Sequence, residues 1–162
     1  MSLSKYNMIY CERQLHAGDH ISWKTKLISG ISNHHAIVVA PKGENRFRVI
    51  HVVNDGGDGY SIASGLPISS SYSVREQIVD LSQQMSKETL CCYYYEPRKC
   101  NEPAEVIQNA RSKIGKFDYD ALNNNDEHFA RWCKTDNNKI KAVCIIVVLM
   151  IVLGLMIIFH FL

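Results

Sequence analysis

The sequence lacks an excess of charge of either sign, because 18 Lys and Arg residues stand against 16 Asp and Glu residues. A nucleic-acid-binding protein normally carries a basic face or stripe, so we expect no nucleic-acid partner. The first residues, MSLSKYNMIYCERQ, also lack the apolar stretch of about 7–15 residues that a secretory signal peptide contains. We therefore expect no secretory signal.

Cysteine motifs of known chemistry are missing as well. The six cysteines form no CxxC pair and no zinc-type spacing; they are Cys11, Cys91, Cys92, Cys100, Cys133 and Cys144. Cys91 and Cys92 are adjacent on a predicted strand, so their side chains point to opposite faces of a sheet. We interpret the set as reduced thiols of a cytosolic domain, since disulfide frameworks belong to oxidising compartments.

One long hydrophobic run is present, at the end of the chain. Residues 142–162, AVCIIVVLMIVLGLMIIFHFL, contain no Asp, Glu, Lys or Arg over 21 positions. A helix of this length spans about 31 Å, close to the ~30 Å hydrocarbon core of a bilayer. A buried helix of a small domain would show a polar face, so the run predicts a transmembrane helix.

The charges beside this run predict its orientation. Lys134, Lys139 and Lys141 precede it, and no charged residue follows. The positive-inside rule then places the preceding domain in the cytosol. We expect a domain over residues 1–138 and a C-terminal transmembrane anchor over residues 139–162, which is the plan of a single-pass, tail-anchored membrane protein.

Within the domain, five stretches rich in β-branched and aromatic residues predict strands. They are residues 20–25, 34–40, 47–53, 74–81 and 90–96. A turn at residues 42–45 joins the second and third stretches as a hairpin. The Gly- and Ser-rich residues 54–73 predict a long loop, a feature that is often functional in a compact domain.

Two helices are predicted after these strands. The first runs from about residue 102 to 114, with Asn101 as its N-cap and Gly115 as its C-terminal stop. Its sheet-facing side carries Val106, Ile107, Ala110 and Ile114. The second helix covers residues 126–134. Strands followed by helices indicate an α+β fold with an antiparallel sheet.

Reactive residue types gather at two places. His34, beside His35, and His51 lie on paired strands of the predicted hairpin, where side chains on the same face can touch. A histidine next to a second polar group is a typical general base. The start of the last helix favours negative charge and would activate a cysteine, but the residue there is Asp126.

Four stretches in this order resemble one known family. They are GDHI at 18–21, HHAIVV at 34–39, VIHV at 49–52 and NDEHFARWCKT at 125–135. The chain resembles the lecithin:retinol acyltransferase-like family, which includes small membrane-anchored phospholipase A/acyltransferases. The resemblance implies a permuted papain-like fold, in which the histidine strand precedes a helix that presents the nucleophile. It also implies phospholipid acyl chains and a membrane as partners.

The resemblance assigns roles residue by residue. His34 matches the family's catalytic base, and His51 matches the second histidine, which orients the first. Residues 127–129 match those after the nucleophile. The nucleophile should be a cysteine directly after Asn125, and this chain has Asp126 at that position.

The exchange changes what the site can do. In the implied reaction a thiolate attacks the lipid ester and forms an acyl-thioester, which water, an amine or an alcohol then resolves. Asp126 would instead form a mixed anhydride, which is steeply uphill from an ester. Loss of a nucleophile costs several orders of magnitude in rate. As the first residue of a helix, Asp126 is also well suited to be a cap.

Other cysteines and a metal are the alternatives. Cys133 lies about 10 Å further along the helix than residue 126, beyond reach of a base aimed there, whereas Cys91 or Cys92 would have to face the site from a strand. Two histidines and a carboxylate, here His34, His51 and Asp126, can also bind zinc or iron. The implied geometry sets these three in line rather than converging, so no cofactor is expected.

These observations lead to two functional hypotheses. The first is a catalytically impaired, tail-anchored member of the family that acts as a lipid- or partner-binding module. The alternative is an active enzyme: a phospholipase A1/A2 or N-/O-acyltransferase that uses His34 as its base and an unidentified nucleophile, or a metal-dependent hydrolase with His34, His51 and Asp126 as ligands.

Overall fold

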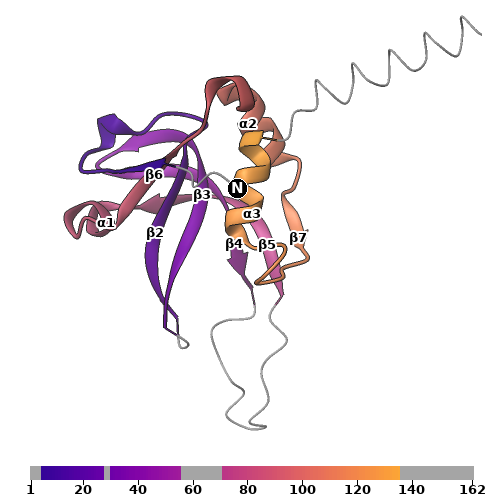
Figure 1. Ribbon diagram of the computed structural model, residues 1–162. Helices are drawn as coiled ribbons and strands as arrows, with labels where there is room; N and C mark the ends of the chain where they lie inside the picture. The colour runs from indigo at the N-terminus through magenta and orange to yellow at the C-terminus, as the bar shows by residue number, and fades with distance from the viewer. Residues whose placement is uncertain (1–4, 28–29, 56–70, 136–162) are drawn as a thin grey trace, which may run out of the picture.

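The structure is a computed structural model that describes residues 5–27, 30–55 and 71–135. Within these residues, seven strands form one antiparallel sheet in the order β1-β6-β2-β3-β4-β5-β7 (Figure 1). The strands are β1 Lys5–Met8, β2 His20–Leu27, β3 Gly30–Gly43, β4 Arg46–Asn54, β5 Tyr72–Asp80, β6 Leu90–Tyr94 and β7 Gly115–Phe117. The helices are α1 Ser82–Ser86, α2 Pro103–Arg111 and α3 Asp126–Thr135, with single 3-10 turns at Glu12–Gln14 and Pro97–Lys99. This confirms an α+β fold built on an antiparallel sheet.

The predicted hairpin is the centre of the sheet. β3 and β4 are joined by Glu44 and Asn45, whose φ angles of 58° and 59° are those of a type I′ turn. This turn matches the right-handed twist of the strands on either side. The pairing of β3 with β4 shifts register twice near the turn, between Val38 and Ala40 and between Pro41 and Gly43. Extra residues are therefore accommodated in β3 without disturbing its pairing further from the turn.

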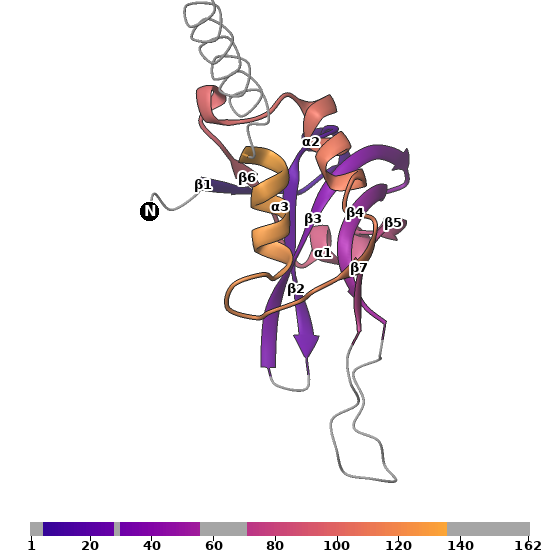
Figure 2. The same cartoon turned by 90° about the vertical axis from the view of Figure 1, so that its right-hand side faces the viewer.

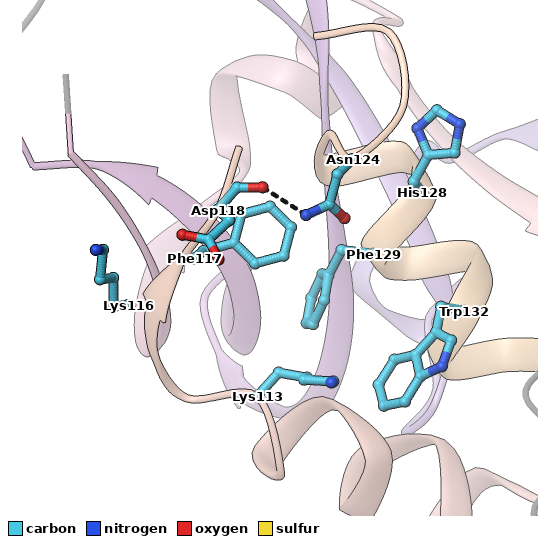
Figure 3. Close-up of a pocket in the computed structure, with 8 residues that line it drawn as sticks. All are labelled: Lys113, Lys116, Phe117, Asp118, Asn124, His128, Phe129 and Trp132. Atoms are coloured by element: carbon cyan, nitrogen blue, oxygen red, sulfur yellow. Dashed lines mark hydrogen bonds between the residues drawn. The ribbon is translucent and has the colours of Figure 1, made fainter. Parts of the chain in front are cut away.

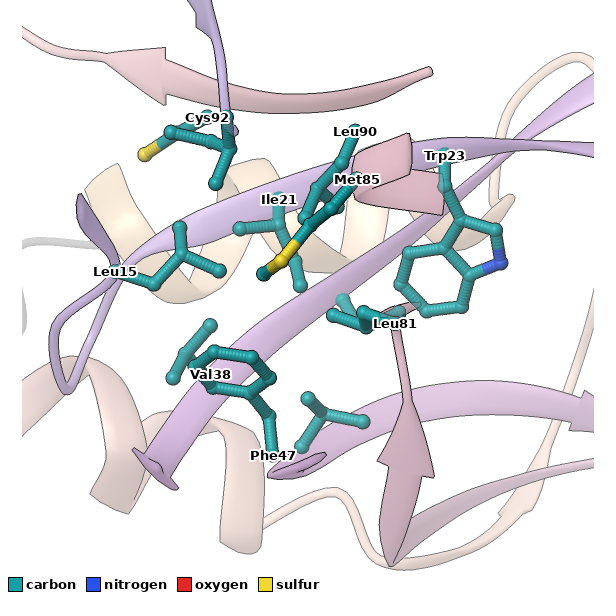
Figure 4. Close-up of a cluster of buried hydrophobic side chains, with 12 residues drawn as sticks. Leu15, Ile21, Trp23, Val38, Phe47, Leu81, Met85, Leu90 and Cys92 are labelled. Atoms are coloured by element: carbon teal, nitrogen blue, oxygen red, sulfur yellow. The ribbon is translucent and has the colours of Figure 1, made fainter. Parts of the chain in front are cut away.

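Two hydrophobic clusters hold the sheet, one on each face. The first joins strand residues such as Ile21, Val38 and Phe47 to Met85 of α1 (Figure 4). The second joins strand residues to α2 and α3, which lie together on the other face of the sheet (Figures 1 and 2); its buried members are Ile37, Ile50, Val52, Val74, Val106, Ala110, Phe129, Ala130 and Cys133. Successive residues of β3 thus pack into different clusters, because successive side chains of a strand point to opposite faces of the sheet.

The sheet divides between β3 and β4, and this division creates the candidate site. β3 pairs with β4 as far as the Ala36–His51 pair, although β3 continues beside β2 to Gly30. β4 continues beside β5 to Asn54. Beyond Ala36 the two pairs of strands separate into two arms (Figure 2). Backbone groups of β3 that face the opening are left for a partner other than a strand.

The first predicted helix is shorter than expected and capped differently. α2 ends at Arg111, and Glu102 rather than Asn101 occupies its N-cap position. The Asn101 side chain donates instead to the backbone oxygen of Cys133 at 3.1 Å, which ties the start of α2 to α3. Ile114 lies outside the helix and is 51% exposed, so its predicted place in the core is wrong. The chain leaves the helix early because it must form β7 beside β5.

Two predictions fall largely outside the described residues. The transmembrane anchor was placed at residues 139–162, and most of the loop at 54–73 is likewise beyond the described ranges. Among residues 5–27, 30–55 and 71–135, no helix is long and apolar enough to cross a membrane.

Candidate active site

The N-terminus of α3 is capped by the residue before it. The Asn125 side-chain oxygen accepts hydrogen bonds from the backbone N–H of His128, at 3.0 Å, and lies 2.8 Å from the His128 ring Nδ1. Asn125 is thus the N-cap, and Asp126 is the first helical residue. The expectation that Asp126 caps the helix is therefore only partly met, through one contact from the Glu127 N–H to Asp126 Oδ1 at 3.1 Å.

The second oxygen of Asp126 crosses to strand β3 at the division of the sheet. Asp126 Oδ2 accepts the backbone N–H of His35 at 2.9 Å and lies 3.2 Å from Nδ1 of His34. The carboxylate thus accepts a hydrogen bond from a strand N–H at the point where β4 no longer pairs with β3. Asp126 is consequently a clamp between α3 and β3 as well as a charged partner for His34.

His34 stands between Asp126 and His51. Its Nε2 lies 2.8 Å from His51 Nδ1, and His51 Nε2 lies 3.0 Å from the side-chain oxygen of Gln77. The Trp23 ring meets the His34 ring edge-on, with centroids 4.8 Å apart. The structure brings His34, His51 and Asp126 together in the linear order that the resemblance implied, and it adds Gln77 at the end of the chain.

The electrostatics of this chain follow from burial and hydrogen bonding. Burial is the largest influence on His51 and, with the nearby His34, lowers the His51 pKa to about 4. Burial acts to raise the pKa of Asp126, but the hydrogen bonds from His34 and the His35 N–H outweigh it and hold that pKa below its usual value. At neutral pH, Asp126 is therefore a carboxylate and His51 a neutral ring.

The direction of donation follows from these charge states. Neutral His51 donates its Nε2 proton to the Gln77 oxygen, and its Nδ1 lies 2.8 Å from His34 Nε2. Asp126 accepts from His34 Nδ1. Both ring nitrogens of His34 are therefore engaged, Nδ1 by Asp126 and Nε2 by His51. Neither nitrogen is free to accept a proton from a substrate in this arrangement.

A metal does not suit this arrangement. Asp126 and His51 meet opposite nitrogens of the His34 ring, so the three side chains do not converge on one point. Among the described residues, no group of three or more His, Cys, Asp or Glu side chains is placed to hold a metal ion. The residues of the site therefore do not fit the zinc or iron alternative.

The cysteines considered as substitutes lie elsewhere. Cys133 is fully buried on α3, and burial raises the pKa of its thiol to about 12. Cys92 packs in the first hydrophobic cluster with a thiol pKa likewise raised by burial to about 12. The Cys91 sulfur lies 3.5 Å from the sulfur of Met8 on β1, and burial raises its pKa too. These three thiols are protonated at neutral pH and are poor nucleophiles.

A second chain of buried polar side chains was not expected. His35 is nearly inaccessible, and its Nδ1 lies 2.9 Å from His20 Nε2; His20 Nδ1 in turn lies 2.6 Å from the Tyr95 hydroxyl. Burial lowers the pKa of both histidines, most strongly for His20. Alternation along residues 20–25 and along β3 places His20 and His35 on one face of the sheet, which is the sequence signal for this pair.

Together, the fold and the site define a class of protein: an α+β domain in which the start of a helix presents a side chain to two histidines on adjacent antiparallel strands. The chain belongs to the lecithin retinol acyltransferase family, whose family model matches residues 13–139. The match runs from before β2 to the end of α3 and includes His34, His51 and Asp126. Family membership associates the domain with acyltransferase- and phospholipase-type chemistry on phospholipid acyl groups. No curated protein and no solved structure matches the chain.

Proposed function

We propose that this protein is a catalytically impaired member of the family that binds lipid acyl chains without transferring them. The observation that carries the proposal is the carboxylate of Asp126 at the position of the family's acyl-accepting cysteine, in contact with His34 Nδ1 at 3.2 Å. A carboxylate at this place can hold the fold and the histidine together. It cannot form the thioester on which the family reaction depends.

The state of the base supports the same conclusion. A general base needs a free lone pair within hydrogen-bond reach of the proton it removes. Both nitrogens of His34 have partners, because Nδ1 lies 3.2 Å from Asp126 Oδ2 and Nε2 lies 2.8 Å from His51 Nδ1. Activation of a water molecule by His34 would first require one of these two contacts to break.

The finer fold and the membrane attachment belong to this proposal. The order of elements, with the histidine strand β3 before the helix α3, is that of a permuted papain-like domain. Residues 139–162 would form a C-terminal anchor, with the domain facing the cytosol, because the 21 residues from 142 carry no charge and three lysines precede them. Removal of residues 139–162 should release the protein from membranes to the soluble fraction of expressing cells. Membrane association without these residues would argue against the anchor.

The catalytic part of the proposal is tested with the full chain in mixed micelles of detergent and phosphatidylcholine. The native protein should release no fatty acid above a protein-free blank. Asp126→Cys should release fatty acid and gain the mass of an acyl group on the intact protein. Asp126→Asn serves as the matched control and should stay inactive.

The histidine supplies the decisive comparison. In the Asp126→Cys background, His34→Ala should abolish the gained activity, because the thiol then lacks its base. Turnover by the native sequence that disappears in His34→Ala would overturn the proposal and establish an active enzyme with another nucleophile.

A further inference from the structure

A cavity of about 390 Å³ lies beside α3, between this helix, β7 and the segment that follows α2 (Figure 3). Its size falls within the range of small-molecule sites, roughly 300–1,000 Å³. None of His34, His51 and Asp126 lines it. The cavity is therefore a feature of the fold that the acid–imidazole chain does not explain.

Three aromatic side chains form the apolar part of the cavity. Phe117 of β7 and Phe129 of α3 meet edge to face with centroids 6.1 Å apart, and Trp132 lies one turn further along α3. The rings surround the same space in Figure 3. Phe129 is almost fully buried in the second cluster, so this wall is held by the core rather than by the surface. Apolar ligand surface would be well covered here.

Two lysines add positive charge at the same cavity. The Lys113 ammonium lies over the Trp132 ring, 4.9 Å from its centroid, and Lys116 lines the cavity from β7. In the described part of the chain, neither lysine takes part in an ion pair. Asp118 also lines the cavity, so the two lysines and this aspartate leave one net positive charge. The site is thus complementary to a ligand with a single negative charge beside an apolar body.

The cavity is on a different face of α3 from the acid–imidazole chain. Successive helical residues are turned by about 100°, so Trp132 lies about 120° around the helix from Asp126, with Phe129 between them, and neither Asp126 nor Ala130 lines the cavity. Asp126 contacts β3, and Ala130 is buried against the sheet. A molecule in the cavity would therefore not compete with the His34–Asp126 pair.

We propose that this cavity binds an amphiphilic monoanion, an aliphatic chain that ends in one carboxylate, within the lipid-binding role proposed above. The carboxylate meets Lys113 at the rim, and the chain lies along Phe117, Phe129 and Trp132. Lys113 is pre-positioned by its contact with the Trp132 ring, a cation–π arrangement that survives when an anion approaches the other side of the ammonium.

Photo-cross-linking tests this site with the full chain in neutral-detergent micelles. The probe is a long-chain fatty acid with a diazirine in its chain; after irradiation, trypsin and mass spectrometry locate the label. Cleavage after Lys116 and Arg131 isolates residues 117–131, which include two of the aromatic rings. This peptide should be labelled saturably, and unlabelled fatty acid should compete. The same probe ending in an alcohol should label it about ten-fold less, the loss expected for one charged hydrogen bond.

Charge variants provide the matched controls. Lys113→Glu should reduce labelling of residues 117–131 about ten-fold or more, and Lys113→Gln by less, whereas Asp118→Asn should increase it. Lys87→Glu makes the same charge change at an exposed position after α1 and should have no effect. Thermal unfolding of each variant verifies that the exposed substitutions leave the fold intact.

Several results would overturn the proposal. Equal labelling by the acid and the alcohol would show that charge is not recognised, and displacement of the probe by inorganic phosphate would show an anion site without chain recognition. Label confined to residues 142–162, or labelling unchanged in Lys113→Glu, would also refute it. These readouts do not involve Asp126, so they remain interpretable if the native protein proves able to hydrolyse lipid.

Discussion

Replacement of Asp126 by Asn tests whether the carboxylate joins α3 to β3. The change keeps the size of the side chain and one oxygen, which can still accept the His35 N–H now bonded at 2.9 Å. The same oxygen lies 3.2 Å from His34 Nδ1, whereas the amide nitrogen takes the place of Oδ1, which now accepts the Glu127 N–H at 3.1 Å. Two donors then oppose each other at Glu127, and the contact with His34 loses its negative charge.

The cost follows from the kind of contact that is removed. A hydrogen bond to a charged group contributes about 1.5–3 kcal/mol. Both side chains are mostly buried, with 23% of His34 and 14% of Asp126 exposed, so solvent screening reduces this little. We expect Asp126→Asn to lower the free energy of unfolding by about 2 kcal/mol at pH 7. Urea unfolding followed by circular dichroism measures it.

A neighbouring residue gives the control. Glu127 pairs with Arg131 one turn along α3 at 2.7 Å, with both side chains about one-third exposed. Such i,i+4 pairs contribute only about 0.3–0.5 kcal/mol, so Glu127→Gln should change stability little. A double-mutant cycle of Asp126→Asn with His34→Gln should give a coupling free energy of about 1–2 kcal/mol.

The stability that Asp126 contributes should depend on pH in a definite direction. The pKa of Asp126 is lower in the folded than in the unfolded chain, so its stabilisation is present above the unfolded value, about 3.9, and is lost as pH falls through the folded one. The difference between native protein and Asp126→Asn should hold from pH 7 to about pH 5 and close below about pH 4. Equal stability of the two proteins at pH 7 would refute the stabilising role of the Asp126 carboxylate between α3 and β3.

Three further predictions follow from buried groups and backbone geometry. Burial lowers the His51 pKa to about 4, so on acidification protons bind the unfolded chain before the folded one. Between pH 6.5 and 4 the free energy of unfolding of the native protein should therefore fall by about 3 kcal/mol more than that of His51→Gln, as measured by urea unfolding. An alkylating reagent at neutral pH should modify exposed Cys11 but not Cys133, whose buried thiol has a pKa of about 12; rapid modification of Cys133 in the folded state would contradict its burial. Gly18→Ala should cost about 2–4 kcal/mol in thermal unfolding, since φ is +84° and a Cβ would lie 2.7 Å from Pro103 Cα; an unchanged melting temperature would refute this.

The contact between His34 and His51 was predictable because it needs only two strands and a turn. Alternation places both side chains on one face of the hairpin, and the structure puts their nitrogens 2.8 Å apart. Gln77 was not predictable in the same way. It reaches His51 from β5. The register that pairs Gln77 with Val49 depends on the length of the connection between β4 and β5, and no sequence signal specifies that length.

The role of Asp126 shows why local propensity is insufficient at this site. Asn125 and Asp126 are adjacent, and both residue types are favoured as N-caps, so sequence alone does not decide which one caps. The structure gives the cap to Asn125 and frees Asp126 for β3. That choice depends on the division between β3 and β4, a tertiary feature. The predicted first helix was too long for the same reason, because the apolar periodicity continues to Ile114, close to the start of β7.

A carboxylate is well suited to replace a thiolate here, because it preserves what the surroundings require of that position. The division of the sheet leaves the His35 N–H in need of an acceptor, and His34 Nδ1 lies beside the same position. A residue without a side-chain acceptor would leave the His35 N–H unpaired, which typically costs about 1–3 kcal/mol. Asp126 contacts both groups with a single oxygen. The histidine chain from His34 through His51 to Gln77 is therefore anchored to α3 by Asp126 and contributes to the stability of the fold, whether or not the domain transfers acyl groups.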